Sequence, residues 1–175
     1  MKLYLKNHTE RYPVEQLQLQ LFAQEPSEFC TEPFTGDGTV SSLSRGKRYL
    51  TATAKVTYQG KTGFAVNRVL LDRADVRATR RILQRSYYLA ALQVLPAAPP
   101  WGALSGVRPT KLSTKCLMAG GSEKDAEKLL REAYFVSPER ARLCVDASRH
   151  TVEAAKLLDA DDLSVYIGIP FCPTR

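Results

Sequence analysis

Two consecutive segments with period-two alternation of apolar and polar residues constrain this fold most. Residues 49–58 place Leu, Ala, Ala, Val and Tyr on one face and mainly Thr and Lys on the other, which is the pattern of a half-buried strand. Gln59-Gly60-Lys61 supplies the glycine that a tight reversal favours, and residues 62–71 form the expected partner strand. The apolar residues of this second strand change parity part-way along, which predicts a bulge near Asn67-Arg68. We therefore expect an antiparallel hairpin.

A helical pattern follows the hairpin directly. Apolar residues recur at three- and four-residue spacing over residues 72–95, and Asp72 or Asp75 is available as the N-cap. Pro96 and two further prolines follow, and they end the helix because proline lacks an amide hydrogen and clashes with the preceding turn. We expect this long helix to lie across the sheet.

Shorter elements are expected on both sides of this unit. Alternation over residues 2–6 predicts a short strand, whereas residues 30–46 are rich in Thr, Gly and Ser and predict a loop. Downstream, residues 101–111 are expected to be an irregular connector. Two helices follow at residues 123–135 and 138–158, and each has a serine immediately before it as N-cap.

The last part of the sequence is a nearly continuous apolar run from Leu163 to Phe171. Such a run is typical of a strand buried on both faces, as in a parallel sheet. A strand of this kind needs neighbours, so we expect its sheet partners to lie beyond Arg175. The predicted fold is α+β: an amino-terminal sheet and helix at 1–97, a helical connector at 98–161 and the first strand of another domain at 162–175.

Composition limits the classes of protein that fit. No apolar run approaches the roughly 18–20 residues that cross a bilayer, and the first residues have no signal-peptide pattern, so we expect a cytoplasmic protein without a membrane partner. The four cysteines form no Cys-x-x-Cys pair, which favours reduced thiols over a disulfide framework. The net charge of +7 favours an anionic partner without choosing among them.

The end of the chain holds the most specific motif. It reads Ser-Val-Tyr-Ile-Gly-Ile-Pro-Phe-Cys-Pro-Thr-Arg over residues 164–175. This motif resembles the first barrel strand and cluster loop of radical S-adenosylmethionine enzymes, in which a Cys-x3-Cys-x2-Cys loop follows the strand. The resemblance implies that Cys172 is the first cluster cysteine and that Tyr166 points toward the cofactor. The ordinary alternative is a small buried cysteine after an apolar strand.

A second segment narrows the resemblance. Residues 100–111 read Pro-Trp-Gly-Ala-Leu-Ser-Gly-Val-Arg-Pro-Thr-Lys, which is similar to the segment preceding the barrel in oxygen-independent coproporphyrinogen III dehydrogenases of the HemZ type. The resemblance implies an incomplete radical S-adenosylmethionine α/β barrel after residue 162, cut inside the cysteine motif. One departure concerns the substrate, since Gly168 stands where better-known members have histidine.

The resemblance also implies cofactors and a reaction for the intact enzyme. These are a 4Fe-4S cluster, S-adenosylmethionine and oxidative decarboxylation of propionate side chains of a porphyrinogen in heme biosynthesis. The chain alone has one of the three motif cysteines, so we expect it to hold no stable cluster and to be inactive by itself. A radical enzyme with another substrate is the alternative in the same superfamily.

Two cations and a basic stripe are candidates for binding anions. Arg108 and Lys111 suit a carboxylate or phosphate of a substrate, and the alternative role for both is a helix cap or an interdomain salt bridge. Arginines also recur at helical spacing over residues 73–85, which places a basic stripe on the long helix; the alternative is a solvated helix face. His8 and His150 have no second metal ligand at suitable spacing and are expected to be surface or capping residues.

The rival function from another class is a nucleic-acid-binding module that uses this basic stripe. The two strands of the hairpin do not present the paired aromatics of a base-stacking sheet, so nucleic acid is the less favoured partner. A small-molecule substrate is the favoured one.

Overall fold

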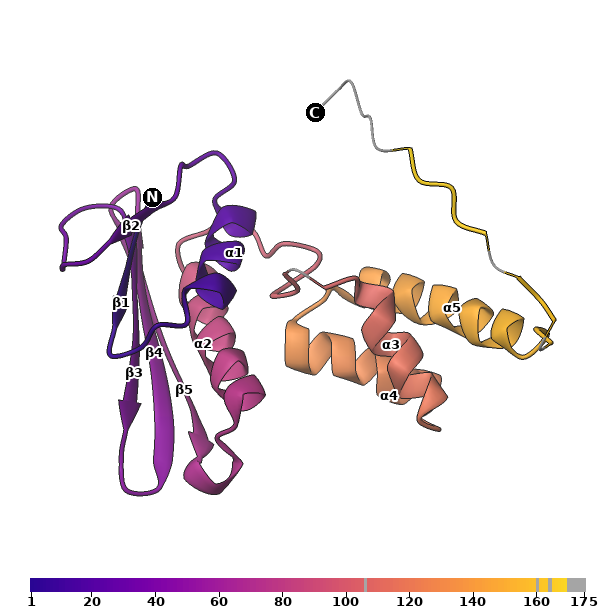
Figure 1. The fold of residues 1–175 in the computed structure, drawn as a ribbon. Coiled ribbons are helices and arrows are strands. Elements are labelled where there is room, and N and C mark those ends of the chain that lie inside the picture. The colour runs from indigo at the N-terminus through magenta and orange to yellow at the C-terminus, as the bar shows by residue number, and fades with distance from the viewer. Residues whose placement is uncertain (106, 160, 164, 170–175) are drawn as a thin grey trace.

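A computed structural model describes residues 1–105, 107–159, 161–163 and 165–169. Its first half is a five-stranded mixed sheet in the order β2-β1-β3-β4-β5, with helices α1 and α2 packed on one face (Figure 1). β1 (Lys2–Lys6) pairs in parallel with both β2 (Glu28–Cys30) and β3 (Gly38–Arg45), and the remaining pairs are antiparallel. The predicted α+β class is confirmed.

The hairpin is the best-predicted part of the sheet. β4 (Tyr49–Tyr58) and β5 (Lys61–Leu70) pair antiparallel from Tyr49 opposite Leu70 to Tyr58 opposite Lys61 without an interruption in register. The predicted bulge near Asn67-Arg68 is therefore wrong. Asn67 lies on the helix-covered face although it is polar, because its amide donates to Ser86 Oγ at 3.3 Å. The alternation of the strand is thus preserved through a polar residue.

Helix α2 (Val76–Ala91) lies across β4 and β5, as predicted. Its N-cap is Asp75, whose carboxylate accepts from the Ala78 amide at 2.6 Å, so the second of the two proposed caps is the one used. A single 3₁₀ turn, Leu71–Arg73, stands between β5 and the helix. The close packing of α2 on β4 depends on small side chains, because Ala52 and Ala54 of β4 are fully buried beneath the helix.

Some elements of the first half escaped the sequence patterns. Residues 38–45, predicted as a loop, form the central strand β3, and its buried positions Thr39 and Ser41 explain why no apolar alternation was visible. The helix α1 (Arg11–Leu21) was not predicted either. It contacts α2 and buries Val14 and Leu17 completely.

The second half of the described chain is helical. The predicted irregular connector at 101–111 is partly wrong, because α3 (Pro109–Met118) begins inside it with proline in the first turn, where its missing amide hydrogen costs nothing. The expected helix at 123–135 is α4 (Glu123–Lys128) continued by a π-helical turn, Leu129–Ala133. α5 (Pro138–Ala155) is capped by Ser137, as predicted.

Each half has its own hydrophobic cluster, and an aromatic contact joins them. The first cluster lies between the sheet and helices α1 and α2, and the second lies among α3, α4 and α5. Tyr88 of α2 stacks on Phe135 with ring centroids 5.0 Å apart, and the Ala103 amide donates to the Tyr134 carbonyl at 2.7 Å. The loop after the π-helical turn is thus attached to the sheet half.

The apolar segment after α5 is not part of a strand in the residues that the structure describes; its expected sheet partners lie beyond Arg175, so the buried strand at 163–171 stays a prediction. Leu163 is 92% exposed and Ile167 is 83% exposed. Residues 170–171 lie outside the described residues. An apolar run becomes a buried strand only when neighbouring strands accept its backbone hydrogen bonds, and none of the five described strands pairs with it. Among the described residues, no helix combines the length and the apolar character needed to span a membrane.

Candidate functional site

A pocket of about 460 Å³ lies between α3 and α5 and contains both cations that the sequence singled out. Arg108 and Lys111 line it, although 101–111 was expected to be irregular. The other lining residues, which the sequence analysis did not select, are Thr110, Thr114, Lys115, Met118 and Thr151. We call this set of residues the α3 pocket.

The start of α3 determines how the cations meet. Arg108 is the N-cap residue, and its carbonyl accepts from the Lys111 amide at 3.0 Å. Lys115 lies one helical turn beyond Lys111, so the two lysines share a face. The described part of the chain contains no ion pair to Arg108, Lys111 or Lys115. Three cations along α3, of which Arg108 and Lys111 lie at its N-terminus and Lys115 in its last turn, favour a carboxylate or phosphate ligand.

Buried hydroxyl contacts hold the two walls of the α3 pocket together. Ser113 and Ser148, both completely buried, lie 2.6 Å apart through their hydroxyl oxygens. Ser148 Oγ also donates to the Thr110 carbonyl at 3.2 Å, which ties α5 to the first turn of α3. This pairing fixes the first turn of α3, where Lys111 and its neighbours stand.

A second pocket of about 330 Å³ adjoins the first at Thr110, which lines both. Trp101, Leu104 and Val107 contribute to its lining, together with Cys144 of α5. Burial raises the pKa of the Cys144 thiol, so this group is a packing residue and not a reactive thiolate. The two pockets together offer cations on one side of Thr110 and an indole on the other.

Lys115 is one pocket residue that the sequence could have predicted. Lys115 follows Lys111 at a spacing of four, which predicts proximity once 109–118 is recognised as a helix that begins with proline. Thr151 comes from α5, and no local pattern connects it with α3. Only the packing of the two helices places it at the pocket.

The basic stripe on α2 is partly used inside the fold. Arg80 pairs with Glu10 at 2.7 Å, and the Arg85 guanidinium lies 4.8 Å from the centroid of the Phe135 ring. Arg77 and Arg73 remain exposed. The stripe is therefore not a continuous free surface for an anion.

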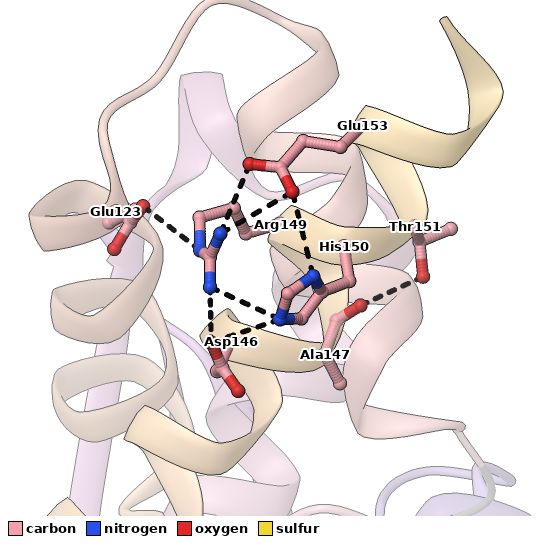
Figure 2. Close-up of polar contacts among 7 residues, drawn as sticks. All are labelled: Glu123, Asp146, Ala147, Arg149, His150, Thr151 and Glu153. Atoms are coloured by element: carbon pink, nitrogen blue, oxygen red, sulfur yellow. Dashed lines mark hydrogen bonds and ion pairs between the residues drawn. The ribbon is translucent and has the colours of Figure 1, made fainter. Parts of the chain in front are cut away.

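The histidines have different surroundings. His8 is half-buried with Nε2 at 3.2 Å from the Ser41 carbonyl, and burial lowers its pKa. His150 is exposed beside Asp146 and Glu153 in a network on α5 (Figure 2). No group of three or more His, Cys, Asp or Glu side chains within the described ranges is suited to a metal ion.

The network of Figure 2 connects α4 with α5. Arg149 pairs with Asp146 at 2.8 Å, with Glu153 at 3.1 Å and with Glu123 of α4 at 3.7 Å. The hydrogen bond from Arg149 lowers the pKa of the Asp146 carboxyl. A group whose pKa is lowered by folding stabilises the protein above its unfolded pKa and loses this contribution as pH falls through the folded value.

We therefore expect Asp146→Asn to lower the melting temperature at pH 7. The difference from the unmodified protein should be complete above the unfolded pKa of about 4 and should shrink as pH falls below it toward the lowered folded pKa, because the carboxyl is then progressively protonated in both states. Circular dichroism melts at several pH values measure this. Asp161→Asn, on an exposed carboxylate after α5, is the matched control and should show no comparable pH dependence. A constant difference at all pH values would contradict the role assigned to the charge.

The two residues of the carboxy-terminal motif are not assembled with the α3 pocket by any described contact. Tyr166 is 94% exposed. Cys172 lies outside the described residues. The described cysteines, Cys30, Cys116 and Cys144, are free thiols. The described residues therefore do not form a site that fits a 4Fe-4S cluster.

Comparison with known proteins gives one informative match. The chain is 30% identical over 166 residues to the oxygen-independent coproporphyrinogen-III oxidase-like protein HemZ of Bacillus subtilis (strain 168). The aligned region is 92% of this chain and 32% of the relative, so the chain spans about a third of the length of the curated relative it matches. This similarity supports a relationship to HemZ-like proteins. No family model matches the chain, and no solved structure matches it.

Proposed function

We propose that this chain is the amino-terminal part of a HemZ-like radical S-adenosylmethionine oxidoreductase of the cytoplasm. The observation that supports the proposal most is the alignment, which extends over 92% of the chain. The motif Tyr-Ile-Gly-Ile-Pro-Phe-Cys at residues 166–172 also supports it, because it resembles the start of a radical S-adenosylmethionine cluster loop. The proposed activity belongs to the full-length protein.

In this proposal Cys172 is one of three thiolate ligands of a 4Fe-4S cluster, and Tyr166 lies near the bound S-adenosylmethionine. Cluster and S-adenosylmethionine would supply the radical chemistry. Soft sulfur ligands suit such clusters. The described residues contribute a different function, which is to bind and orient an anionic substrate.

The α3 pocket supports a substrate that has several carboxylates. Arg108, Lys111 and Lys115 have no ion pair among the described residues. The neighbouring second pocket, which Trp101 lines, would accept an apolar ring. A coproporphyrinogen has this combination of propionates and a large apolar ring system. Gly168 leaves the alternative of another carboxylated substrate of a radical enzyme.

The coding sequence after Arg175 provides the first test. Cysteines at the first and fourth positions would complete a Cys-x3-Cys-x2-Cys motif that begins at Cys172. Other residues at these positions would overturn the assignment of a radical S-adenosylmethionine enzyme, whatever the substrate.

Substrate binding can be tested with coproporphyrin III, the stable oxidised form of the proposed substrate. We expect titration followed by porphyrin absorbance to show binding that Arg108→Ala/Lys111→Ala weakens about tenfold or more, because each lost charge-assisted bond contributes about 1 kcal/mol or more.

Lys124→Ala/Lys156→Ala is the matched control, since it also removes two positive charges but lies outside the α3 pocket. Equal weakening by both double variants would mean that net charge alone attracts the porphyrin. That result would remove the α3 pocket from the proposal without affecting the role of Cys172.

A further inference from the structure

Among the elements that the structure describes, no helix packs on one face of the sheet. α1 and α2 both lie on the same side (Figure 1), and the contacts of α2 are with β3, β4 and β5 on that side. On the opposite face, which we call the open face, Phe64 is 56% exposed and Val66 is 49% exposed. Between β3 and β5, the residues of β4 on this face include Thr51, Thr53 and Thr57.

The open face has a strong excess of positive charge. β1, β3, β4 and β5 contain no Asp or Glu. Strand alternation and register place Lys2, Lys6, Lys55 and Arg68 on this face. None of the four has an ion pair within the described residues. The acidic exception is Glu28, opposite Lys2 at the edge strand β2.

Aromatic rings accompany these cations. Register connects Tyr4, Val40, Lys55 and Phe64 as one row across four strands. Tyr4 and Phe64 are therefore about 14 Å apart, or three strand spacings. The hairpin alone presents no paired aromatics, whereas the two rings of this row come from β1 and β5, the first and last of these four strands.

A third ring, Tyr49, lies on the same face at the start of β4, away from the row. Tyr49 has the Arg68 guanidinium 4.7 Å and the Arg48 guanidinium 5.9 Å from its ring centroid. A shallow pocket of about 340 Å³ lies on the other side of the row, lined in part by Phe34, Lys55 and Thr62. The open face thus alternates rings, cations and hydroxyl groups.

We propose that the open face binds single-stranded nucleic acid. Phosphates would pair with the unpaired cations, and bases would stack on the exposed rings, as single-stranded binding surfaces generally require. A duplex presents its bases internally and would not use the rings. The activity is separate from the α3 pocket, which lies in the helical half of the chain.

Fluorescence anisotropy with a labelled 12-nucleotide uridine RNA at low salt tests the proposal. Lys55→Gln/Arg68→Gln should weaken binding about tenfold and reduce the slope of log affinity against log salt by about 1.4, which is two phosphate contacts at about 0.7 each. Arg73→Gln/Arg77→Gln removes the same charge from two exposed positions, Arg73 in the 3₁₀ turn and Arg77 in α2, and should change affinity less than twofold.

Phe64→Leu tests the ring separately, since it keeps an apolar side chain in β5. We expect a loss of about fivefold with an unchanged salt slope, because stacking contributes about 1 kcal/mol or more per base. Circular dichroism of each variant verifies folding.

The proposal is overturned if the chain fails to bind the RNA, if both double variants weaken binding equally, or if duplex RNA binds as well as the single strand. Binding to anionic phosphatidylserine vesicles in place of RNA would assign the face to a membrane surface and also overturn it.

Discussion

Replacing Cys172 by serine in the full-length protein is expected to abolish the cleavage of S-adenosylmethionine to 5′-deoxyadenosine. A serine hydroxyl is a hard oxygen donor and a poor substitute for a thiolate on iron, so loss of one of three ligands leaves the cluster labile. The measurement is the amount of 5′-deoxyadenosine formed by anaerobically reconstituted protein with a chemical reductant, together with its iron content.

Cys30→Ser is the matched control for this experiment. Cys30 is partly exposed on the edge strand β2, and its thiol has only a weak contact of 4.0 Å with the Glu28 carbonyl. This variant should keep its iron and its rate. If Cys172→Ser formed 5′-deoxyadenosine at the unmodified rate, Cys172 would not be a cluster ligand and the proposed function would fail with it.

Replacing Gly63 by alanine is expected to destabilise the sheet half by about 2–3 kcal/mol. A Cβ at this position of β5 would overlap the Ala90 carbonyl oxygen of α2 and lie 3.0 Å from the carbonyl carbon. Both neighbours are backbone or close to it, so the helix must move away from the strand, and overpacking of this kind typically costs about 1–3 kcal/mol. Urea unfolding followed by circular dichroism measures the change.

Gly46→Ala is the matched control, the same substitution at a position with room for a Cβ. Its Cβ would meet only the Tyr49 carbonyl oxygen at 3.5 Å, an ordinary contact distance. We expect a change within about 1 kcal/mol, in the stabilising direction, because alanine restricts the unfolded chain more than glycine does. Equal destabilisation by the two substitutions would contradict the assignment of the cost at Gly63 to its contact with Ala90 of α2.

The sequence predicted those elements whose local pattern agrees with their burial. The hairpin of β4 and β5 and the helix α2 were predicted because their apolar residues follow period two and period 3.6. β3 was missed because its buried positions hold Thr39 and Ser41, whose polarity hides the alternation. The bulge was wrong for a related reason, since Asn67 occupies an inward position by bonding to Ser86.

In the candidate site, too, residues close in sequence could be predicted, and residues brought in by helix packing could not. Arg108 and Lys111 are close in sequence, so their convergence could be predicted, whereas Thr151 reaches the α3 pocket only because Ser113 and Ser148 join the two helices. The apolar run at 163–169 depends on tertiary information as well, and its strand stays a prediction. Its composition predicts a buried strand, but burial depends on partners that a local pattern does not contain.

The aromatic joint at Phe135 has a consequence for the geometry of the whole described chain. Tyr88 stacks on this ring at an interplanar angle of 25°, and Arg85 lies over it while donating to the Glu132 carbonyl at 3.2 Å. Two residues of α2 therefore contact the end of the π-helical turn and Phe135 after it, and α5 begins at Pro138, three residues after Phe135. A single ring held in this way resists rotation as well as separation. The contacts with α2 therefore determine the orientation of α5. Because α2 packs on the sheet, the orientation of α5 is also defined relative to the sheet.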